Sequence, residues 1–265
     1  MSVSDQLGML DADVVVSGRN TLHRVFVHGS SVSDNVAAIN LDAIKSVEAD
    51  PVSYERSEKL YQQGGGDDAL QYNIGQSHGV RITVYAGQLP TFLAYLMGTT
   101  TFGKTGYAAQ NLTFDALARF DIESVYRKKD NATHLFSLIH QDLVIQPFAV
   151  PSPMEDVDVV IPAMSYHDPI VLAAGCEAVY SQYNGDGSTT TFTLPATPLS
   201  LRDLTVGNAD DWVLEKLIYC KVKLSTDEQG SRQKSGISIS GTSLTFTTAP
   251  AAGSVVQVLF AKETA

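Results

Sequence analysis

Short runs of β-branched and aromatic residues, separated by turn formers, recur through most of this sequence. The run Arg81–Tyr85 alternates polar and apolar side chains, which is the two-residue period of a half-buried strand. Similar runs at 25–27, 143–145 and 157–161 end close to turn-forming residues. This pattern constrains the chain to a mainly β fold.

Helical periodicity is scarce by comparison. Pro90–Met97 predicts a short helix, because proline suits a first helical turn and Gly98 can end it. Its apolar side chains fall on one face, so we expect the helix to pack against a sheet. Residues 35–47 also have apolar side chains at helical spacing, but their Asp and Asn content indicates a loop equally well.

Near Tyr180 the composition changes to Gly, Ser and Thr, which indicates a domain boundary. We therefore expect one domain over 1–179 and a second over 180–265. In the second domain, short strands alternate with turns, a pattern typical of a small antiparallel β-sandwich. Its expected strands are 190–194, 237–239, 244–246 and 255–260, with turns at 184–187, 241–242 and 249–253.

The stretch 54–79 of the first domain is long and polar, and three glycines followed by two aspartates lie near its centre. A segment of this length inside a compact domain is usually functional or mobile. We interpret it as an extended hairpin, or arm, that projects from the body of the domain. A disordered surface loop is the alternative.

The chain is acidic, with a formal net charge of -11. The N-terminal part, up to and including Ser181, holds 11 Lys/Arg and 21 Asp/Glu, a balance of -10, and the remainder holds 7 and 8, a balance of -1. Such a chain does not bind nucleic acid electrostatically, because that binding needs clustered cations. It can lie beside DNA that it repels, although solubility alone also explains the charge.

The sequence offers no signal for a membrane or for secretion. No apolar run approaches the roughly 20 residues that a membrane helix needs. The opening stretch Met1–Leu22 lacks the basic end and apolar middle of a secretory signal. We therefore expect the protein to be made and kept in a cytoplasm, with no membrane partner.

Two motifs with possible chemistry are better explained as ordinary turns or loops. Gly75–Gly79 has the G-x-S-x-G spelling of a hydrolase nucleophile elbow, but a strand rather than a helix follows Ser77. Asn184–Gly187 resembles the start of a calcium loop, but the downstream Glu is absent, so a tight turn is favoured.

Two further groups are weighed in the same way. A metal or acid–base site could be formed by Glu155, Asp156, Asp158, His167 and Asp168, although acidic rims around prolines are usually solvated. Cys176 and Cys220 lie far apart in the sequence, and two small hydrophobic residues are favoured over a disulfide. We therefore expect no enzymatic activity, no metal and no cofactor.

The second domain carries a family resemblance. Gly185–Leu194, followed by Leu244–Gly253 and a final Val-rich strand, is similar to a β-domain that recurs in phage virion proteins. In that pattern a GDGST-x-x-F-x-L start pairs with an LTFT-x-AP-x-x-G finish. The first domain, with its β-rich body, single helix, polar arm and acidic balance, resembles the tail tube subunits of long-tailed bacteriophages.

The resemblance implies a fold of two packed sheets with a flanking helix, assembled as hexameric rings that stack into the phage tail tube. It implies a C-terminal immunoglobulin-like domain displayed outside, a location in the virion and assembly in the host cytoplasm. The implied partners are other copies of the chain and the tape measure, terminator, baseplate and, in a contractile tail, sheath proteins. The genome would pass through an acidic channel without specific binding.

Two alternatives stay open. One is another virion structural protein, such as a neck or tail terminator protein, a baseplate protein or a capsid decoration protein. The other is an enzyme or carbohydrate-binding module on the tail, which the scattered aromatic residues disfavour. Under the tail tube hypothesis the acidic residues expected to face the lumen or a subunit seam are Asp67, Asp68, Glu155, Asp156 and Asp158. The residues expected in the stacking arm are Tyr61, Gly64, Gly65, Gly66 and Tyr72.

Overall fold

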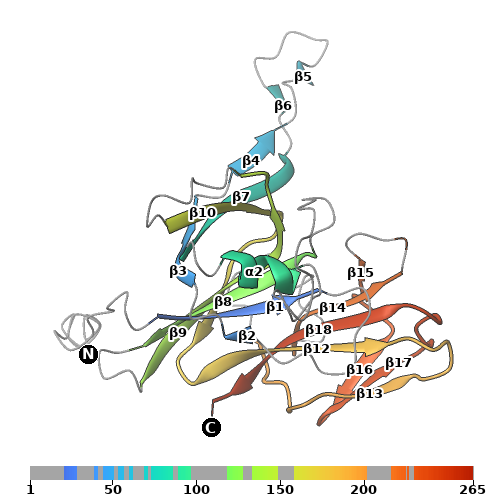
Figure 1. Cartoon of the computed structure of the whole chain (residues 1–265). Coiled ribbons are helices and arrows are strands. Elements are labelled where there is room, and N and C mark those ends of the chain that lie inside the picture. Colours follow the sequence, from blue (N-terminus) through green and yellow to red (C-terminus); the bar gives the residue numbers. More distant parts are fainter. Residues whose placement is uncertain are drawn as a thin grey trace, which may run out of the picture. The chain divides into compact units, whose positions relative to one another are not determined.

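The computed structural model describes the fold of most of the predicted strands. The described residues are 21–28, 39–40, 44–50, 53–56, 60–61, 69–70, 73–85, 89–96, 118–127, 133–148, 158–201, 216–224, 226 and 230–264. Within these ranges every regular element except one helix is a β-strand, and every pairing with a defined register is antiparallel (Figure 1). The predicted mainly β fold is therefore confirmed.

The chain forms two compact units. The first comprises Met1–Leu41, Ile122–Ile139 and Val171–Ala265, and the second comprises Asp42–Asp121 and His140–Ile170. The predicted domain boundary at residue 180 falls inside strand β12 (Cys176–Asn184), which belongs to the first unit. The division into a tube domain and a C-terminal domain therefore stays a prediction.

The N-terminal strands of the first unit have the order β2-β1-β8-β9. Their bounds are β1 (Thr21–Val27), β2 (Ile39–Asn40), β8 (Phe120–Arg127) and β9 (His134–Ile145). Of β8 the residues from Ile122 on belong to this unit, and of β9 the residues up to Ile139; the other residues of both strands belong to the second unit. The short strand β11 (Ile170–Ala173) pairs with β9. Val25 and Phe26 of β1 are almost completely buried, as their apolar run predicts.

The C-terminal part of the first unit is a two-sheet sandwich. One sheet has the order β12-β18-β14-β15 and the other β13-β17-β16. Their bounds are β13 (Thr191–Thr193), β14 (Leu217–Lys223), β15 (Ser231–Arg232), β16 (Ile237–Ser240), β17 (Ser243–Phe246) and β18 (Val255–Glu263). Both sheets contribute to one core, in which Phe192 and Leu244 of one sheet meet Val258 and Phe260 of the other. The predicted antiparallel sandwich and its strands are confirmed.

The second unit is built around the long strand β7 (Asn73–Tyr85). Antiparallel neighbours β3 (Ile44–Ala49) and β10 (Asp158–Ser165) flank its C-terminal part, and the second half of β9 pairs with β10. Along β7 the buried residues Val80, Ile82 and Val84 alternate with more exposed ones. This alternation is the two-residue period expected from the sequence.

The one described helix, α2 (Leu89–Leu96), agrees with the prediction for 90–97 within a residue at each end. Phe92 and Leu96 are almost completely buried, and the Phe92 ring lies edge-on to Phe120, 6.1 Å between centroids. The helix therefore packs through its apolar face, as predicted.

The helical alternative for residues 35–47 is wrong where the structure describes this segment. Residues 39–40 form β2 and residues 44–47 lie in β3. Pairing of β2 with β1, and of β3 with β7, gives their backbone groups cross-strand partners. These long-range hydrogen bonds outweigh a weak helical periodicity.

The predicted arm over 54–79 contains antiparallel pairs. Strand β4 (Ser53–Arg56) pairs with the N-terminal part of β7, so that Tyr54 faces Gln76 and Arg56 faces Asn73. Farther along, β5 (Leu60–Tyr61) pairs with β6 (Ala69–Leu70). This is the arrangement of an extended hairpin (Figure 1).

The two sandwich segments Gly185–Leu194 and Leu244–Gly253 contact each other through their turns. The Gly185 N–H donates to the Ser254 carbonyl at 2.8 Å, and the Gly187 N–H donates to the Pro250 carbonyl at 2.9 Å. In return the Gly253 N–H donates to the Gly185 carbonyl at 3.0 Å. The spacing of glycines in both motifs therefore has a physical reason, because two turns approach each other backbone to backbone.

Gly185 has no room for a side chain. A Cβ at this position would lie 2.2 Å from the Ser254 Oγ and 2.5 Å from the Ala251 carbonyl oxygen. Gly241, at the turn between β16 and β17, has a φ of +57°, but a Cβ at this position would meet no other residue within 4 Å. Glycine is therefore required at position 185 for steric reasons, whereas at position 241 it is favoured only by the backbone conformation.

We predict that Gly185→Ala lowers the free energy of unfolding by about 3 kcal/mol, because a backbone carbonyl cannot move away without breaking the turn contacts. Gly241→Ala is the matched control, with an expected loss of about 1 kcal/mol from the left-handed backbone alone. Urea unfolding followed by circular dichroism measures both. Equal losses would show that the two turns do not need this close approach.

Candidate functional site

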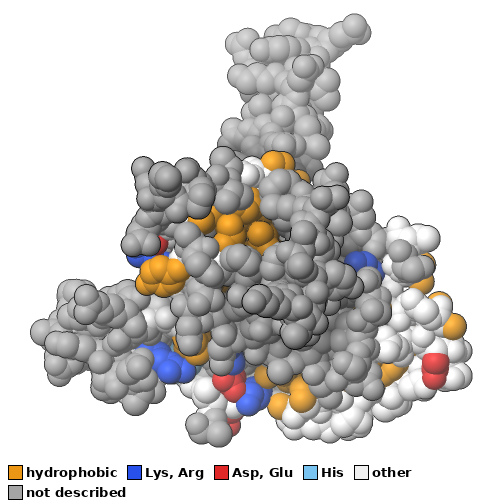
Figure 2. Space-filling model, viewed as in Figure 1, with side chains coloured by type: hydrophobic (Ala, Val, Ile, Leu, Met, Phe, Trp, Pro, Cys, Tyr) orange, Lys and Arg blue, Asp and Glu red, His pale blue; other side chains and the backbone are white. Residues whose placement is uncertain are grey.

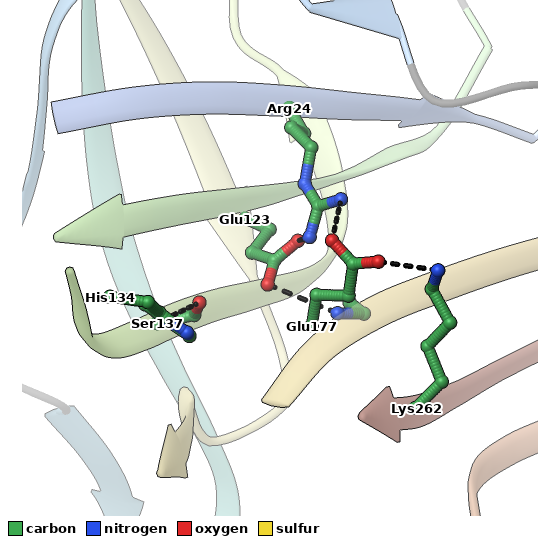
Figure 3. Close-up of polar contacts among 7 residues, drawn as sticks. Arg24, Glu123, His134, Ser137, Glu177 and Lys262 are labelled. Carbon is green, nitrogen blue, oxygen red and sulfur yellow. Dashed lines mark hydrogen bonds and ion pairs between the residues drawn. The ribbon is translucent and has the colours of Figure 1, made fainter. Parts of the chain in front are cut away.

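Four charged side chains form a network across strands of the first unit. Arg24 on β1 forms ion pairs with Glu123 on β8 and, at 3.1 Å, with Glu177 on β12. Glu177 also binds Lys262 on β18, with 2.6 Å between Oε1 and Nζ. Figure 3 shows the guanidinium of Arg24 between the two carboxylates, with Lys262 beyond Glu177.

Glu123 is the most buried member of this network, with a side chain that is 0% exposed. Besides Arg24, its carboxylate accepts a hydrogen bond from the Ala178 N–H at 3.1 Å and one from the Ser137 side chain. Burial raises the pKa of Glu123, and the charge of Arg24 and these hydrogen bonds oppose that rise. An unpaired carboxylate at this position would be strongly destabilising.

The outer part of the network is more accessible to solvent. Burial acts to raise the pKa of Glu177, but the hydrogen bonds and charges of Lys262 and Arg24 outweigh it and lower the pKa overall. Two cations and two anions balance, so the network needs no additional ion. Its geometry ties β1 and β8 to β12 and β18, which is a structural role.

Sequence reasoning missed this network. The available signal was a charged residue next to apolar side chains in the sequence, as with Arg24 before Val25 and Phe26, or Glu123 after Ile122. Such residues are rarely buried without a partner. That signal can indicate that partners exist, but it does not say which residues they are.

Two histidines of the second unit lie together in its interior. His78 on β7 and His140 on β9 are 3% and 1% exposed, with 3.4 Å between Nε2 and Nδ1. Burial, followed by the charge of His78, lowers the pKa of His140 to about 4. Burial and His167 lower the pKa of His78, against the opposing charge of Asp168. Both rings are therefore neutral at pH 7.

His167, one of the candidates weighed for an acid–base site, lies beside Asp142. Its Nε2 is 3.1 Å from the Asp142 carboxylate. Asp142 has a φ of 52°, and its N–H donates to the Asp121 carboxylate at 2.8 Å. The nearby Ser165 hydroxyl donates to the Gln141 carbonyl and accepts from the His167 backbone N–H. Ser165 is therefore not placed as a nucleophile for this imidazole.

The remaining candidate motifs have structural explanations. Ser77 lies inside β7, opposite Ser53, so the strand–turn–helix of a nucleophile elbow does not form there. The Asp186 carboxylate accepts from the Ser188 and Thr189 N–H groups and from the Thr189 hydroxyl, which holds the pKa of Asp186 well below its usual range. These hydrogen bonds close a turn over Asp186–Thr189, while Asn184 still belongs to β12, so the turn begins about two residues later than expected.

Both cysteines are free thiols. Cys220 belongs to the sandwich core, where burial raises its pKa to about 12. Cys176 is half-buried at the start of β12. The preference for two unpaired residues over a disulfide is confirmed.

Two of the ten predicted lumen, seam and arm residues lie within the described parts of the chain. Asp158, on β10, lies opposite Tyr85 of β7. It forms an ion pair with Lys45, and this contact raises the pKa of Lys45. Tyr61 lies in β5 opposite Ala69. The other eight lie outside the described residues, and their assigned roles stay predictions: Asp67, Asp68, Glu155, Asp156, Gly64, Gly65, Gly66 and Tyr72.

We predict that Arg24→Met lowers the free energy of unfolding by about 3 to 5 kcal/mol, because Glu123 is left as a buried, uncompensated charge. Adding Glu123→Gln should recover part of this loss, since the amide is neutral. Lys262→Met is the control, with an expected loss below about 1 kcal/mol for a more exposed ion pair. Urea unfolding measures the stability of all three variants. Similar losses for Arg24→Met and Lys262→Met would show that the buried Arg24–Glu123 pair contributes no more than the more exposed pair.

The buried histidine pair predicts acid sensitivity. An unfolded chain takes up a proton at His140 near pH 6.5 and the folded chain near pH 4, so stability is lost as the pH falls through this window. This difference corresponds to roughly 3 kcal/mol for one histidine. In His140→Gln the free energy of unfolding should therefore fall less on acidification than in the wild type. Urea unfolding of both at several pH values is the measurement, and parallel pH profiles would exclude His140 as the cause.

No helix in the described parts of the chain is long and apolar enough to cross a membrane.

Comparisons with known proteins identify no family. No protein-family model matches the sequence, and no curated protein matches it. Among solved structures, a chain from the sheath–tube complex of an extracellular contractile injection system in its extended state aligns over 65% of this chain and 99% of its own length, at 16% identity and a TM-score of 0.34. At that TM-score the likeness establishes neither a shared fold nor a shared function.

Proposed function

We propose that this chain is a structural virion protein, the tail tube subunit of a long-tailed bacteriophage. The observation that supports this most is the pairing of the GDGST and AP-x-x-G turns at the end of the sandwich. These are the segments through which the sequence resembles phage virion domains. Their mutual hydrogen bonds explain why both halves of the pattern occur together.

The mainly β architecture supports a role in assembly. Strands β3 in the second unit and β13 and β16 in the first lie at the ends of their sheets' strand orders. Such edges present unpaired backbone groups that can bind another chain. Head-to-tail contacts that close after a fixed rotation give rings, and stacked rings give tubes. The proposal places six copies in each ring.

The hairpin of β4 to β7 supports contacts between rings. A projecting pair of strands buries little apolar surface by itself, so it gains most from contact with neighbouring subunits. The acidic balance of the N-terminal part, up to Ser181, supports a channel that repels the DNA backbone as the genome passes. The proposal includes no catalytic step, no cofactor and no membrane partner.

One alternative shares the same support. The GDGST and AP-x-x-G pattern belongs to virion proteins in general, so a neck, terminator, baseplate or capsid decoration protein fits it equally. Growth into tubes distinguishes a tail tube subunit from these alternatives, because those proteins form closed rings or trimers that do not grow into tubes.

Negative-stain electron microscopy of the purified protein over a series of concentrations tests the proposal. We expect hollow tubes of uniform width for the wild type. A variant in which an Asn-Gly turn replaces residues 57–72 should stay folded, because Arg56 and Asn73 already face each other across β4 and β7. We expect this variant to form rings that do not stack. Discrete rings from the wild type would support the alternative, and tubes from the variant would exclude the arm as the stacking element.

A further inference from the structure

The outward face of the sheet formed by β3, β7 and β10 in the second unit carries exposed apolar side chains. On β10, Val160 is 48% exposed although Val159 and Ile161 on either side of it are buried. On β7, Tyr85 is 49% exposed. Val160 faces Thr83 across the strands, and Tyr85 faces Asp158, so the two apolar side chains lie on the same face.

The apolar surface continues along β10. Pro162 and Met164 follow Val160 at the two-residue period and are half-buried. We call Tyr85, Val160, Pro162 and Met164 the apolar strip. Figure 2 shows hydrophobic side chains gathered over β7 and β10, with charged side chains of both signs at one end. An antiparallel sheet that faces water on one side normally has polar residues there, so this strip departs from the pattern of a solvated face.

The rim of the strip is charged but nearly balanced. Lys45 binds Asp158 at one end and lies 6.0 Å from the centre of the Tyr85 ring. At the other end Arg81 binds Asp50 at 2.7 Å. With Glu48, which faces Arg81, these groups comprise two cations and three anions, a balance of -1. The whole chain carries -11.

This charge distribution decides which partner fits. Two cations that each already have an anionic partner are a poor site for nucleic acid, which needs clustered unpaired cations. Lys45 and Arg81 have side chains 49% and 54% exposed, so they can also meet acidic groups from outside. The surface of another copy supplies such groups, because its N-terminal part, up to Ser181, carries ten more acidic than basic side chains.

We propose that the apolar strip is the surface through which the second unit binds a second copy of this chain. The apolar centre supplies the buried area, and tyrosine is a residue type enriched at such contacts. The rim lets two acidic molecules approach with little mutual repulsion. The inference rests on the proposed function for the kind of assembly, and adds to it the contact surface. It also narrows the role predicted for Asp158, which lies in a subunit seam rather than facing the lumen.

Val160→Lys in the full chain tests this contact. A lysine at the centre of a buried apolar contact should weaken self-association at least tenfold, which corresponds to about 1.4 kcal/mol. Val171→Lys is the matched control, because Val171 is 66% exposed on a strand of the first unit, outside the strip. Sedimentation velocity over a wide concentration range measures association, and circular dichroism establishes that each variant is folded. Tyr85→Ser, which removes apolar area without adding charge, replaces Val160→Lys if that variant fails to fold.

The possible outcomes separate this inference from the tail tube proposal. Loss of association in Val160→Lys but not in Val171→Lys supports the strip, whether the wild type forms tubes or only discrete rings. Tubes that form equally well in all variants would retain the tube function and overturn the strip. A wild type that stays monomeric at every concentration would overturn the strip as well.

Discussion

The buried carboxylate of Glu123 is the constraint on which the first unit depends most. A charge without solvent contact requires a partner and several hydrogen bonds, and Arg24, the Ala178 N–H and Ser137 supply them. The groups that satisfy it come from positions 24, 137 and 178, so β1, β9 and β12 must all be in place at once. A shift of one residue would turn the side chain of Arg24 or Ser137 to the opposite face of its sheet, and in β12 it would move the Ala178 N–H away from the carboxylate. The network therefore favours a single register, a kind of specificity that apolar packing alone provides less sharply.

The end of the sandwich achieves specificity by a different means. Around Gly185 the backbone groups of two turns bind one another, and the absence of a side chain permits the approach. The first turn follows Asn184, the last residue of β12, and the second precedes Val255, the first residue of β18. Because Asn184 and Val255 are paired, the contact between the turns also fixes how these strands pair. The motif is thus explained by folding requirements rather than by a bound ligand. A resemblance carried by such a motif therefore concerns how the sandwich folds, and function has to be argued from other surfaces.

Sequence reasoning was most successful where one local pattern determined the outcome. The alternation in Arg81–Tyr85 and the turn-bounded runs after residue 184 each specify a strand without knowledge of its partner. The helical interpretation failed for residues 39–40 and 44–47, because pairing with β1 and β7 outweighs the helical spacing of their apolar residues. Sequence reasoning could not find the Arg24 network or the His78–His140 pair, because each joins positions that are distant in the sequence. For Asp158 the sequence supplied the acidic residue, but its pairing with Lys45 depends on how β10 and β3 are placed beside β7.

The proposed self-association of an acidic chain requires that long-range repulsion be separated from short-range attraction. At physiological ionic strength exposed charges are screened beyond about 8 Å, so the overall charge mainly slows the approach of two copies. The free energy of the contact then depends on the groups that meet in it. An apolar strip whose rim is nearly balanced in charge buries apolar area and adds little repulsion between the two copies. The same screening leaves a short-range field at an acidic surface, which acts on DNA only when the phosphates come close. Net charge and self-association are therefore compatible when the acidic groups and the contact surface occupy different faces of the subunit.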